Sequence, residues 1–181
     1  MTFDLPNTIA LLSRGPATFD ALLRNLPDAW TTCNEGDNTW TPTAVVAHLL
    51  YGERTDWLVR ARLILDYGES RSFAPFDRAG HIPLLAEMSP PALLDAFALE
   101  RAANLDDLRA LNLQPADFAR RGIHPAFGPV TLSQLLATWA AHDMTHLHQV
   151  SRILAHQYRD AVGPWSQFMG VLNCAGHSGP A

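Results

Sequence analysis

The sequence predicts an all-α protein built as a four-helix bundle. Four stretches carry apolar residues at mixed spacings of three and four, which is the pattern of an amphipathic helix. Start signals precede three of these stretches, and no segment shows the two-residue alternation of a half-buried strand. Two long connections separate the helices, as several bundle topologies require. At 181 residues the chain is expected to form one domain, residues 1–181.

Composition and charge argue against several classes of protein. Hydrophobic residues make up 48% of the chain and charged residues 17%, which is not the composition of a disordered protein. No uninterrupted apolar run approaches the roughly 20 residues that span a bilayer, so no membrane partner is expected. A net charge of −5 without a cluster of Lys or Arg argues against a nucleic-acid partner. The first residues lack the features of a secretory signal, which predicts a cytoplasmic protein.

The first helix is expected from about Asn7 to Leu26, with an interruption at Gly15-Pro16. Proline removes one backbone hydrogen bond and clashes with the preceding turn, so we expect a kink or a short first turn before the main helix. The segment 27–39 is expected to be a loop, with two tryptophans closing over the core, Trp30 and Trp40.

The second helix is expected to begin at Thr41-Pro42 and to run to about Tyr67. Thr41 can accept a hydrogen bond from a free amide at the N-cap, and Pro42 has no amide to leave unpaired. Gly68 can end the helix in a left-handed conformation. The connection 68–89 that follows is longer than most linkers in compact domains. Its phenylalanines, Phe73 and Phe76, are compatible with a lid over a site and equally with a loop tucked onto the bundle.

The third and fourth helices also begin at recognisable signals. Ser89-Pro90 opens a helix to about Leu111, and the irregular segment 112–130, with one short turn near 115–118, separates it from the fourth helix. Thr131 and Gln134 have the spacing of a capping box, and this last long helix runs to about Tyr158. A short helix is then expected to pack three apolar side chains against the bundle, Trp165, Phe168 and Leu172. A mobile tail is expected at 174–181.

The fourth helix concentrates the chemistry of the chain. His142 and His146 are four residues apart, so their imidazoles lie on one face and can converge on a metal ion. That face also carries apolar residues, so both histidines are expected to point inward. His48 lies in a similar apolar stripe of the second helix, and a metal normally needs at least three protein ligands. The sequence therefore indicates a divalent ion, Zn²⁺ or Ni²⁺, bound by His48, His142 and His146.

A simpler interpretation stays open for each histidine. Any one of them can be a core residue that hydrogen-bonds a neighbour, and a pair at this spacing by itself gives about even odds of binding a metal. The other histidines are expected in loops, at the surface, at a helix end or in the tail; they are His81, His124, His148, His156 and His177. The two cysteines, Cys33 and Cys174, stand in no ligand spacing and are assigned no role.

Four segments together resemble the DinB/YfiT-like metalloenzyme family. They are the block from Trp40 to His48, Arg101-Ala-Ala-Asn104-Leu105, the block from His124 to Leu132, and Trp139-Ala-Ala-His142-Asp-Met-Thr-His146-Leu-His-Gln149. The resemblance covers nearly the whole chain and is weakest in the first helix, the connection 68–89 and the tail. It implies a bundle of up-down-down-up topology, often dimeric, in which three histidines hold a divalent ion. These map onto His48, His142 and His146.

Function is open between three hypotheses. Because the family includes thiol-S-transferases and isomerases that use low-molecular-weight thiols, the first is a metal-dependent enzyme that binds a small-molecule substrate or such a thiol, with a hydrolase as a lesser alternative. The second interprets His142-Asp143-Met-Thr-His146 as a variant metalloprotease helix with Asp143 as base, which we rank low. Asp143 is expected to face outward or to support a ligand. The third is a metal-binding bundle or dimeric binding module without catalysis.

Overall fold

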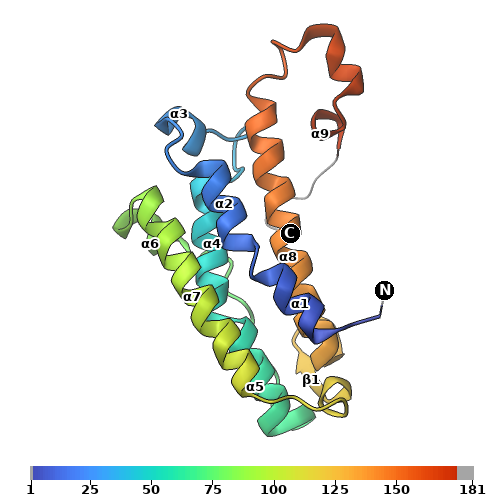
Figure 1. Cartoon of the computed structure of the whole chain (residues 1–181). Coiled ribbons are helices and arrows are strands. Elements are labelled where there is room, and N and C mark those ends of the chain that lie inside the picture. The colour runs from blue at the N-terminus through green and yellow to red at the C-terminus, as the bar shows by residue number, and fades with distance from the viewer. Residues whose placement is uncertain (1, 175–181) are drawn as a thin grey trace.

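The computed structural model describes residues 2–174 and consists mainly of helices (Figure 1). The helices are α1 (Leu5–Leu12), α2 (Gly15–Leu23), α3 (Asp28–Thr31), α4 (Pro42–Thr55), α5 (Trp57–Tyr67), α6 (Ile82–Glu87), α7 (Pro90–Ala110), α8 (Leu132–His156) and α9 (Gly170–Asn173). The strands β1 (Arg121–His124) and β2 (Gly128–Thr131) form an antiparallel hairpin. Short 3₁₀ turns occupy Gly68–Ser70, Asp117–Ala119 and Gly163–Phe168.

The long helices form the predicted four-helix bundle with up-down-down-up topology. In Figure 1, α1 and α2 run upward, α4 and α5 run downward, α7 also runs downward, and α8 runs upward. α4 packs against α7, α1 and α5 against α8, and α2 against α7. Because α5 and α7 run in the same direction, the connection between them must return along the length of the bundle. This return explains the length of the connection and carries it past the middle of α4.

The predicted helix starts at Thr41 and Thr131 are confirmed. The hydroxyl of Thr41 accepts a hydrogen bond from the amide of Ala44, and Thr131 and Gln134 form both hydrogen bonds of a capping box. The uninterrupted helix expected over 41–67 is wrong, because α4 and α5 meet at Asp56, whose φ of −118° and ψ of −71° leave the helical region. Asp56 forms a short ion pair with Arg60 at this break.

The hairpin of β1 and β2 was not expected from the sequence. Arg121 pairs with Thr131 and His124 with Gly128, so the two strands have only four residues each. Strands this short, interrupted by Gly and Pro, cannot display a recognisable alternation of apolar and polar residues. The hairpin connects the lower ends of α7 and α8, and Phe73 of the long connection donates its amide to the carbonyl of Ile123.

Two apolar clusters fill the bundle, and buried polar residues separate them. One cluster joins α1, α5 and the first half of α8, and the other joins α2, α4, α7 and the second half of α8. On α7, Arg101 stands between Phe97 of one cluster and Leu105 of the other. Glu53 on α4 and Asp143 on α8 interrupt the apolar stripes of their helices at the same level. A buried polar layer therefore crosses the middle of the bundle.

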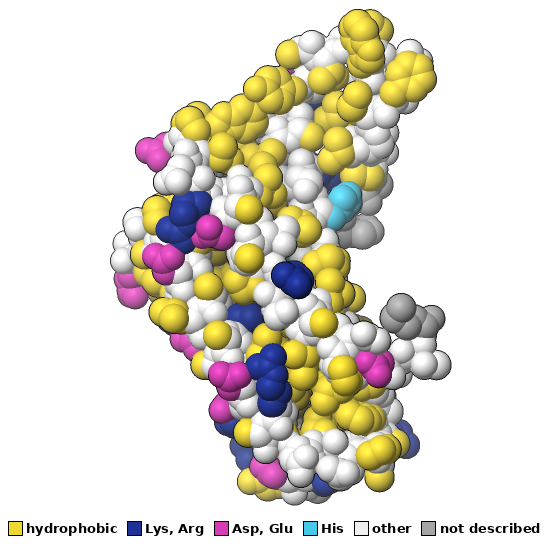
Figure 2. Space-filling model, viewed as in Figure 1, with side chains coloured by type: hydrophobic (Ala, Val, Ile, Leu, Met, Phe, Trp, Pro, Cys, Tyr) yellow, Lys and Arg dark blue, Asp and Glu magenta, His cyan; other side chains and the backbone are white. Residues whose placement is uncertain are grey.

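The segment after α8 differs from its prediction. It forms a 3₁₀ turn and α9, but Trp165 is 65% exposed and Phe168 is 75% exposed, so these rings do not pack down. Leu172 alone of the three expected side chains is half-buried. Figure 2 shows apolar side chains gathered at this end of the molecule. The rest of the tail predicted to be mobile, residues 175–181, lies outside the described residues. Among residues 2–174, no helix has the length and apolar character needed to cross a membrane.

Candidate metal centre

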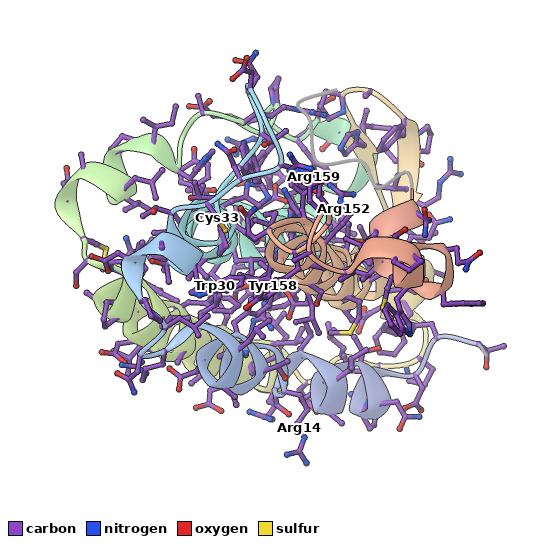
Figure 3. The ribbon with its side chains drawn as sticks, turned by 90° about the horizontal axis from the view of Figure 1, so that it is seen from above. Arg14, Trp30, Cys33, Arg152, Tyr158 and Arg159 are labelled. Atoms are coloured by element: carbon purple, nitrogen blue, oxygen red, sulfur yellow. The ribbon has the colours of Figure 1, made fainter. Side chains whose placement is uncertain are left out.

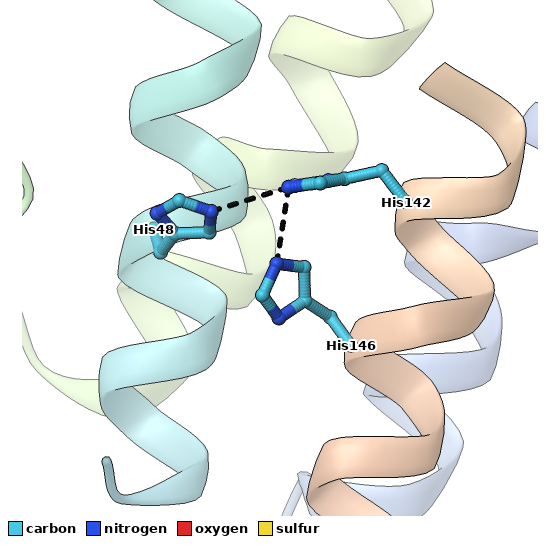
Figure 4. A group of neighbouring side chains, drawn as sticks. All are labelled: His48, His142 and His146. Carbon is cyan, nitrogen blue, oxygen red and sulfur yellow. Dashed lines mark hydrogen bonds between the residues drawn. The ribbon is translucent and has the colours of Figure 1, made fainter. Parts of the chain in front are cut away.

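The structure brings together the three histidines that the sequence singled out. α4 carries His48 and α8 carries His142 and His146, and their imidazoles face each other between the two helices (Figure 4). The Nε2 atom of His142 lies 3.3 Å from Nε2 of His48 and 3.0 Å from Nε2 of His146. One nitrogen of each ring lies within 4.8 Å of the others. Residues 94 positions apart in the chain thus present their nitrogens to a common point.

The spacing of these nitrogen atoms fits a shared metal ion. Nitrogen ligands of one tetrahedral ion, at bond lengths of about 2.0–2.1 Å, stand about 3.3 Å from each other. The separations of His142 Nε2 from the other two Nε2 atoms, 3.3 and 3.0 Å, are close to this value and are also the lengths of N–H···N hydrogen bonds between the rings. Nδ1 of His48 and of His142 are buried without a hydrogen-bond partner among the described residues. Each of these two rings therefore has one buried nitrogen that the described residues leave without a partner.

Burial keeps the three imidazoles neutral. Desolvation, aided by the charge of His146 and other neighbours, lowers the pKa of His48 to about 3 and that of His142 to about 2. Desolvation also lowers the pKa of His146, although a hydrogen bond to Gln149 opposes the shift. Metal ligation requires the unprotonated imidazole. The site consequently offers three neutral nitrogen donors at neutral pH.

Gln149 sets the tautomer of one of these donors. Its Oε1 lies 2.7 Å from Nδ1 of His146, and because an amide oxygen can only accept, Nδ1 of His146 must donate. The proton on Nδ1 leaves a lone pair on Nε2, the atom that faces His142. Hydrogen bonds of this type commonly orient metal-binding histidines. Gln149 thus supports the ligand geometry from the next turn of α8.

Aromatic side chains surround the three histidines. The ring of Trp40 stacks nearly parallel to His146 with centroids 6.1 Å apart and lies 4.8 Å from the ring of His48. Trp57, at the start of α5, packs edge-on against His142 at 5.1 Å, and Phe76 packs edge-on against His48 at 5.5 Å. These rings limit the access of water and lower the local polarity. The break at Asp56 contributes to this aromatic surround, because α5 begins at Trp57, directly after the break.

The loop that leads to Trp40 is fixed to the end of α8. Arg152 donates two hydrogen bonds to the carboxylate of Glu35, at 2.7 and 2.5 Å. Nearby, Trp30 packs against Tyr158 with ring centroids 5.2 Å apart, and the view from above shows these two residues side by side (Figure 3). Arg152 occupies the position where an extended metalloprotease motif would have its third histidine, and here it anchors this loop instead.

For the connection 68–89, the interpretation as a loop tucked onto the bundle is supported, and the lid over a site stays a prediction. Phe73 is buried in the core, so the first half of the connection is tucked onto the bundle. The second half passes over α4, where Phe76 contacts His48 and Tyr51. His81, expected to be solvated in this loop, is instead only 4% exposed, and its ring lies 5.8 Å from that of His48. No sequence signal marked His81, because its burial depends on the path of the connection.

The expectation that Asp143 faces outward is wrong. Asp143 is 1% exposed and accepts hydrogen bonds from both terminal nitrogens of Arg101, at 2.6 and 2.9 Å. Glu53 accepts from Arg101 at 2.8 Å, from the indole of Trp139 at 2.9 Å and from the amide of Asn104 at 2.9 Å. With both oxygens engaged by a guanidinium, Asp143 is not placed to act as the base of a metalloprotease. We call these five residues the arginine cluster.

Arg101 also compensates for the proline in the first helix. Pro16 lacks the amide that would pair with the carbonyl of Leu12, and Arg101 donates to this carbonyl at 2.8 Å. Gly15 is required here because a Cβ atom would lie 2.5 Å from Oδ2 of Asp143. Hydrogen bonds and attraction to Asp143 and Glu53 raise the pKa of Arg101, although burial alone would lower it. The guanidinium is therefore charged and holds α1, α4 and α8 together.

The remaining histidines of residues 2–174, apart from His81, have their contacts elsewhere. His124 stacks on Phe127 in the hairpin with centroids 4.4 Å apart, and Nε2 of His156 accepts from Arg159. His148 is exposed as expected, and its Nε2 lies 3.3 Å from Sγ of Cys174. Cys33 and Cys174 are both free thiols. His177 lies outside the described residues.

Comparisons with known proteins agree with this architecture. The family model of the DinB superfamily matches residues 11–150. YfiT from Bacillus subtilis, described as a probable metal-dependent hydrolase with an unusual four-helix bundle topology, matches with a TM-score of 0.68 at 21% identity, over 87% of each chain. A mycothiol-dependent maleylpyruvate isomerase matches with a TM-score of 0.62 at 17% identity, over 83% of this chain and 63% of its own. No curated protein sequence matches.

Proposed function

The chain belongs to the DinB superfamily, and from this premise we propose that it is a metal-dependent enzyme whose divalent ion is held by His48, His142 and His146. The observation that carries the proposal is the convergence of three neutral, largely buried imidazoles with Nε2 separations of 3.0 and 3.3 Å. Zn²⁺ and Ni²⁺ are the ions best suited to such a set of imidazole donors. Three protein ligands are typical of a catalytic centre, whereas structural zinc usually has four.

The favoured reaction is transfer of a low-molecular-weight thiol to an electrophilic small molecule. A divalent ion with an open coordination position lowers the pKa of a bound thiol or water and so supplies a nucleophile near neutral pH. Gln149 orients one of the three donors, His146, and the rings of Trp40, Trp57 and Phe76 pack around the histidines and exclude water. The likeness to a mycothiol-dependent isomerase supports a thiol as the small-molecule partner.

Hydrolysis is the second candidate, because the similar structure of YfiT carries the description of a probable metal-dependent hydrolase. In this case water would take the place of the thiol. A metal-binding bundle without catalysis is the remaining alternative. The arginine cluster argues against it, since the middle of the bundle already has a buried polar layer that joins its helices without a metal.

We also propose a cytoplasmic homodimer. Free thiols at Cys33 and Cys174 agree with a reducing compartment. Apolar side chains exposed after α8, with Trp165 and Phe168 the most exposed, offer a surface that a second copy could cover. Measurement of the molar mass of the wild type and of the variant Trp165→Ser/Phe168→Ser by light scattering tests the dimer.

Metal analysis of the purified protein tests the proposed site. The wild type is expected to bind about one equivalent of Zn²⁺ or Ni²⁺, and the variant His48→Ala/His142→Ala/His146→Ala none. His124→Ala is the matched control, because His124 is partly buried but distant from the cluster. Equal metal content in the triple variant and the wild type would contradict the assignment. A screen of thiol transfer and of ester and amide hydrolysis, with and without chelator, then separates the two reactions.

A further inference from the structure

A fourth imidazole lies beside the three histidines and comes from the connection 68–89. The ring of His81 is perpendicular to that of His48 with centroids 5.8 Å apart, and it lies 4.9 Å from the ring of Trp40. His81 is only 4% exposed. Burial lowers the pKa of its ring and a hydrogen bond with the backbone of Arg78 opposes this shift, yet Nδ1 lacks a well-aligned partner within residues 2–174. Burial of a polar atom without a partner is unfavourable, so a partner from outside the chain is expected.

The connection is packed so that His81 is held in this position. Phe76 contacts the rings of both His48 and Tyr51, at 5.5 and 5.4 Å. Gly80 directly precedes His81, and a Cβ atom at Gly80 would collide with the ring of Tyr51. The backbone at Gly80 therefore packs directly against the outer end of the Tyr51 ring. This close approach places His81 next to the site and distinguishes it from a loop histidine that reaches the bundle by chance.

His81 is not one of the converging nitrogen donors. Among the described residues, the group whose ligand atoms lie within 4.8 Å of one another contains His48, His142 and His146. The ring centroids of these three are 4.3 to 5.3 Å apart, and the distance from His81 to His48 is longer. His81 thus lies at the edge of the site, with its ring against those of both Trp40 and His48.

We propose that His81 is a substrate-binding residue, which hydrogen-bonds a polar atom of the low-molecular-weight thiol bound beside the three histidines and does not ligate the metal. The proposal rests on the proposed function. A neutral imidazole has one donor and one acceptor nitrogen, so it can bond a thiol, a hydroxyl or an amide of the ligand. The sequence motif of three histidines contains no residue in this role.

The test uses the cobalt-loaded protein, whose visible absorption reports ligands of the ion. Titration with Co²⁺ gives the metal affinity, and titration of the loaded protein with 2-mercaptoethanol gives the affinity for a thiol. His81→Phe keeps an aromatic ring beside Trp40 but removes both nitrogens, and His81→Asn returns a polar atom near the position of Nδ1. His124→Phe in the hairpin is the control, since His124 packs against the rings of Phe73 and Phe127 and accepts a hydrogen bond from the amide of Ala126.

In His81→Phe the affinity for Co²⁺ is expected to stay within twofold of the wild type. Its affinity for 2-mercaptoethanol should fall about threefold to tenfold, which corresponds to the loss of one hydrogen bond. His81→Asn should restore most of this affinity, and His124→Phe should change neither value. An unchanged thiol affinity in His81→Phe, or a tenfold loss of Co²⁺ affinity that makes His81 a ligand, would overturn the inference while the three-histidine site stands. A wild type that binds no Co²⁺ would instead overturn the proposed function together with the inference.

Discussion

Two buried polar clusters share the helices α4 and α8, with the arginine cluster also including α7, and they are built in opposite ways. In the arginine cluster, Arg101 is matched by two carboxylates, and Glu53 also accepts from Trp139 and Asn104. The histidine cluster consists of His48, His142 and His146, whose Nε2 atoms point toward one another. The Nδ1 atoms of His48 and His142 have no hydrogen-bond partner among the described residues.

The difference indicates which cluster maintains the fold and which can bind a ligand. In the arginine cluster the charges are matched inside the core, and only Nε of the guanidinium lacks a hydrogen-bond partner among the described residues, so this cluster mainly joins the helices. Converging neutral nitrogens leave their lone pairs available, which is unfavourable without a ligand and favourable with one. His142 and Asp143 are neighbours in the chain but belong to different clusters. The direction in which each side chain leaves α8 therefore determines which cluster it joins.

The largest effect is expected from removal of the charge at Arg101. Arg101→Met leaves the carboxylates of Glu53 and Asp143 buried without their partner, which should lower the free energy of unfolding by about 3–5 kcal/mol. Urea denaturation followed by circular dichroism measures this. Arg109→Met on the exposed face of the same helix, where Arg109 pairs with Asp106, should cost less than about 0.5 kcal/mol. Equal costs at the two positions would show that the arginine cluster does not hold the fold.

Adjacent positions on α8 offer a sharper comparison. In the metal-free protein, Asp143→Asn removes charge-assisted hydrogen bonds to Arg101 and should cost about 2–3 kcal/mol. His142→Gln, one residue earlier, leaves no charge unpaired and should cost less than about 1 kcal/mol. The same denaturation experiment with chelator present compares them. A larger cost for His142→Gln would reverse the roles assigned to the two clusters.

Gly15→Ala tests how tightly the first helix is packed against the arginine cluster. Its Cβ atom would meet Oδ2 of Asp143 at 2.5 Å, so the carboxylate or the helix must shift, at a cost of about 1–2 kcal/mol. Gly170→Ala is the control, because a Cβ atom at Gly170 meets nothing within 4 Å. Thermal melting of both variants checks the expectation. A melting temperature unchanged by Gly15→Ala would mean that the contact is loose.

The smallest effect is a pH dependence of the metal-free protein that arises in the histidine cluster. The folded pKa values of about 3 for His48 and 2 for His142 lie below the ordinary value near 6.5. As pH falls below 6.5, the unfolded state takes up protons that the folded state does not, so stability is lost, by about 1 kcal/mol per histidine between pH 7 and 5.5. Denaturation at both pH values measures the loss.

The double variant His48→Gln/His142→Gln should reduce this dependence. Asp56 acts in the opposite direction, because burial raises its folded pKa to about 6, despite Arg60, and it binds a proton more readily in the folded state. Both proteins are therefore compared in the background Asp56→Asn. Equal pH dependence with and without His48 and His142 would exclude the histidine cluster as its source.

Much of the fold was predictable because helix signals are local. The caps at Thr41 and Thr131, the interruption at Gly15-Pro16 and the periodic apolar positions each depend on residues within one or two turns. The three-histidine set could be selected for the same reason, since the spacing of His142 and His146 fixes their common face. His48 was selected as their partner because it lies in a similar apolar stripe of the second helix, and the family resemblance, confirmed by the match over residues 11–150, implied the same residue.

The missed features depend on contacts between distant segments. The break at Asp56, the short hairpin, the burial of His81 and the inward direction of Asp143 are decided by what approaches from elsewhere in the bundle. Asp143 in particular lies about 100° around the helix from His142, and only the arrival of Arg101 from α7 makes that direction buried.

The sequence alone determined which segments are helical and which imidazoles share a face, because backbone hydrogen bonding and side-chain periodicity act over a few residues. Tertiary structure decided which buried polar groups have hydrogen-bond partners and which do not. Pairing requires groups 42 to 94 residues apart to meet within hydrogen-bond distance, and that depends on how the helices cross and on the path of the connection between α5 and α7.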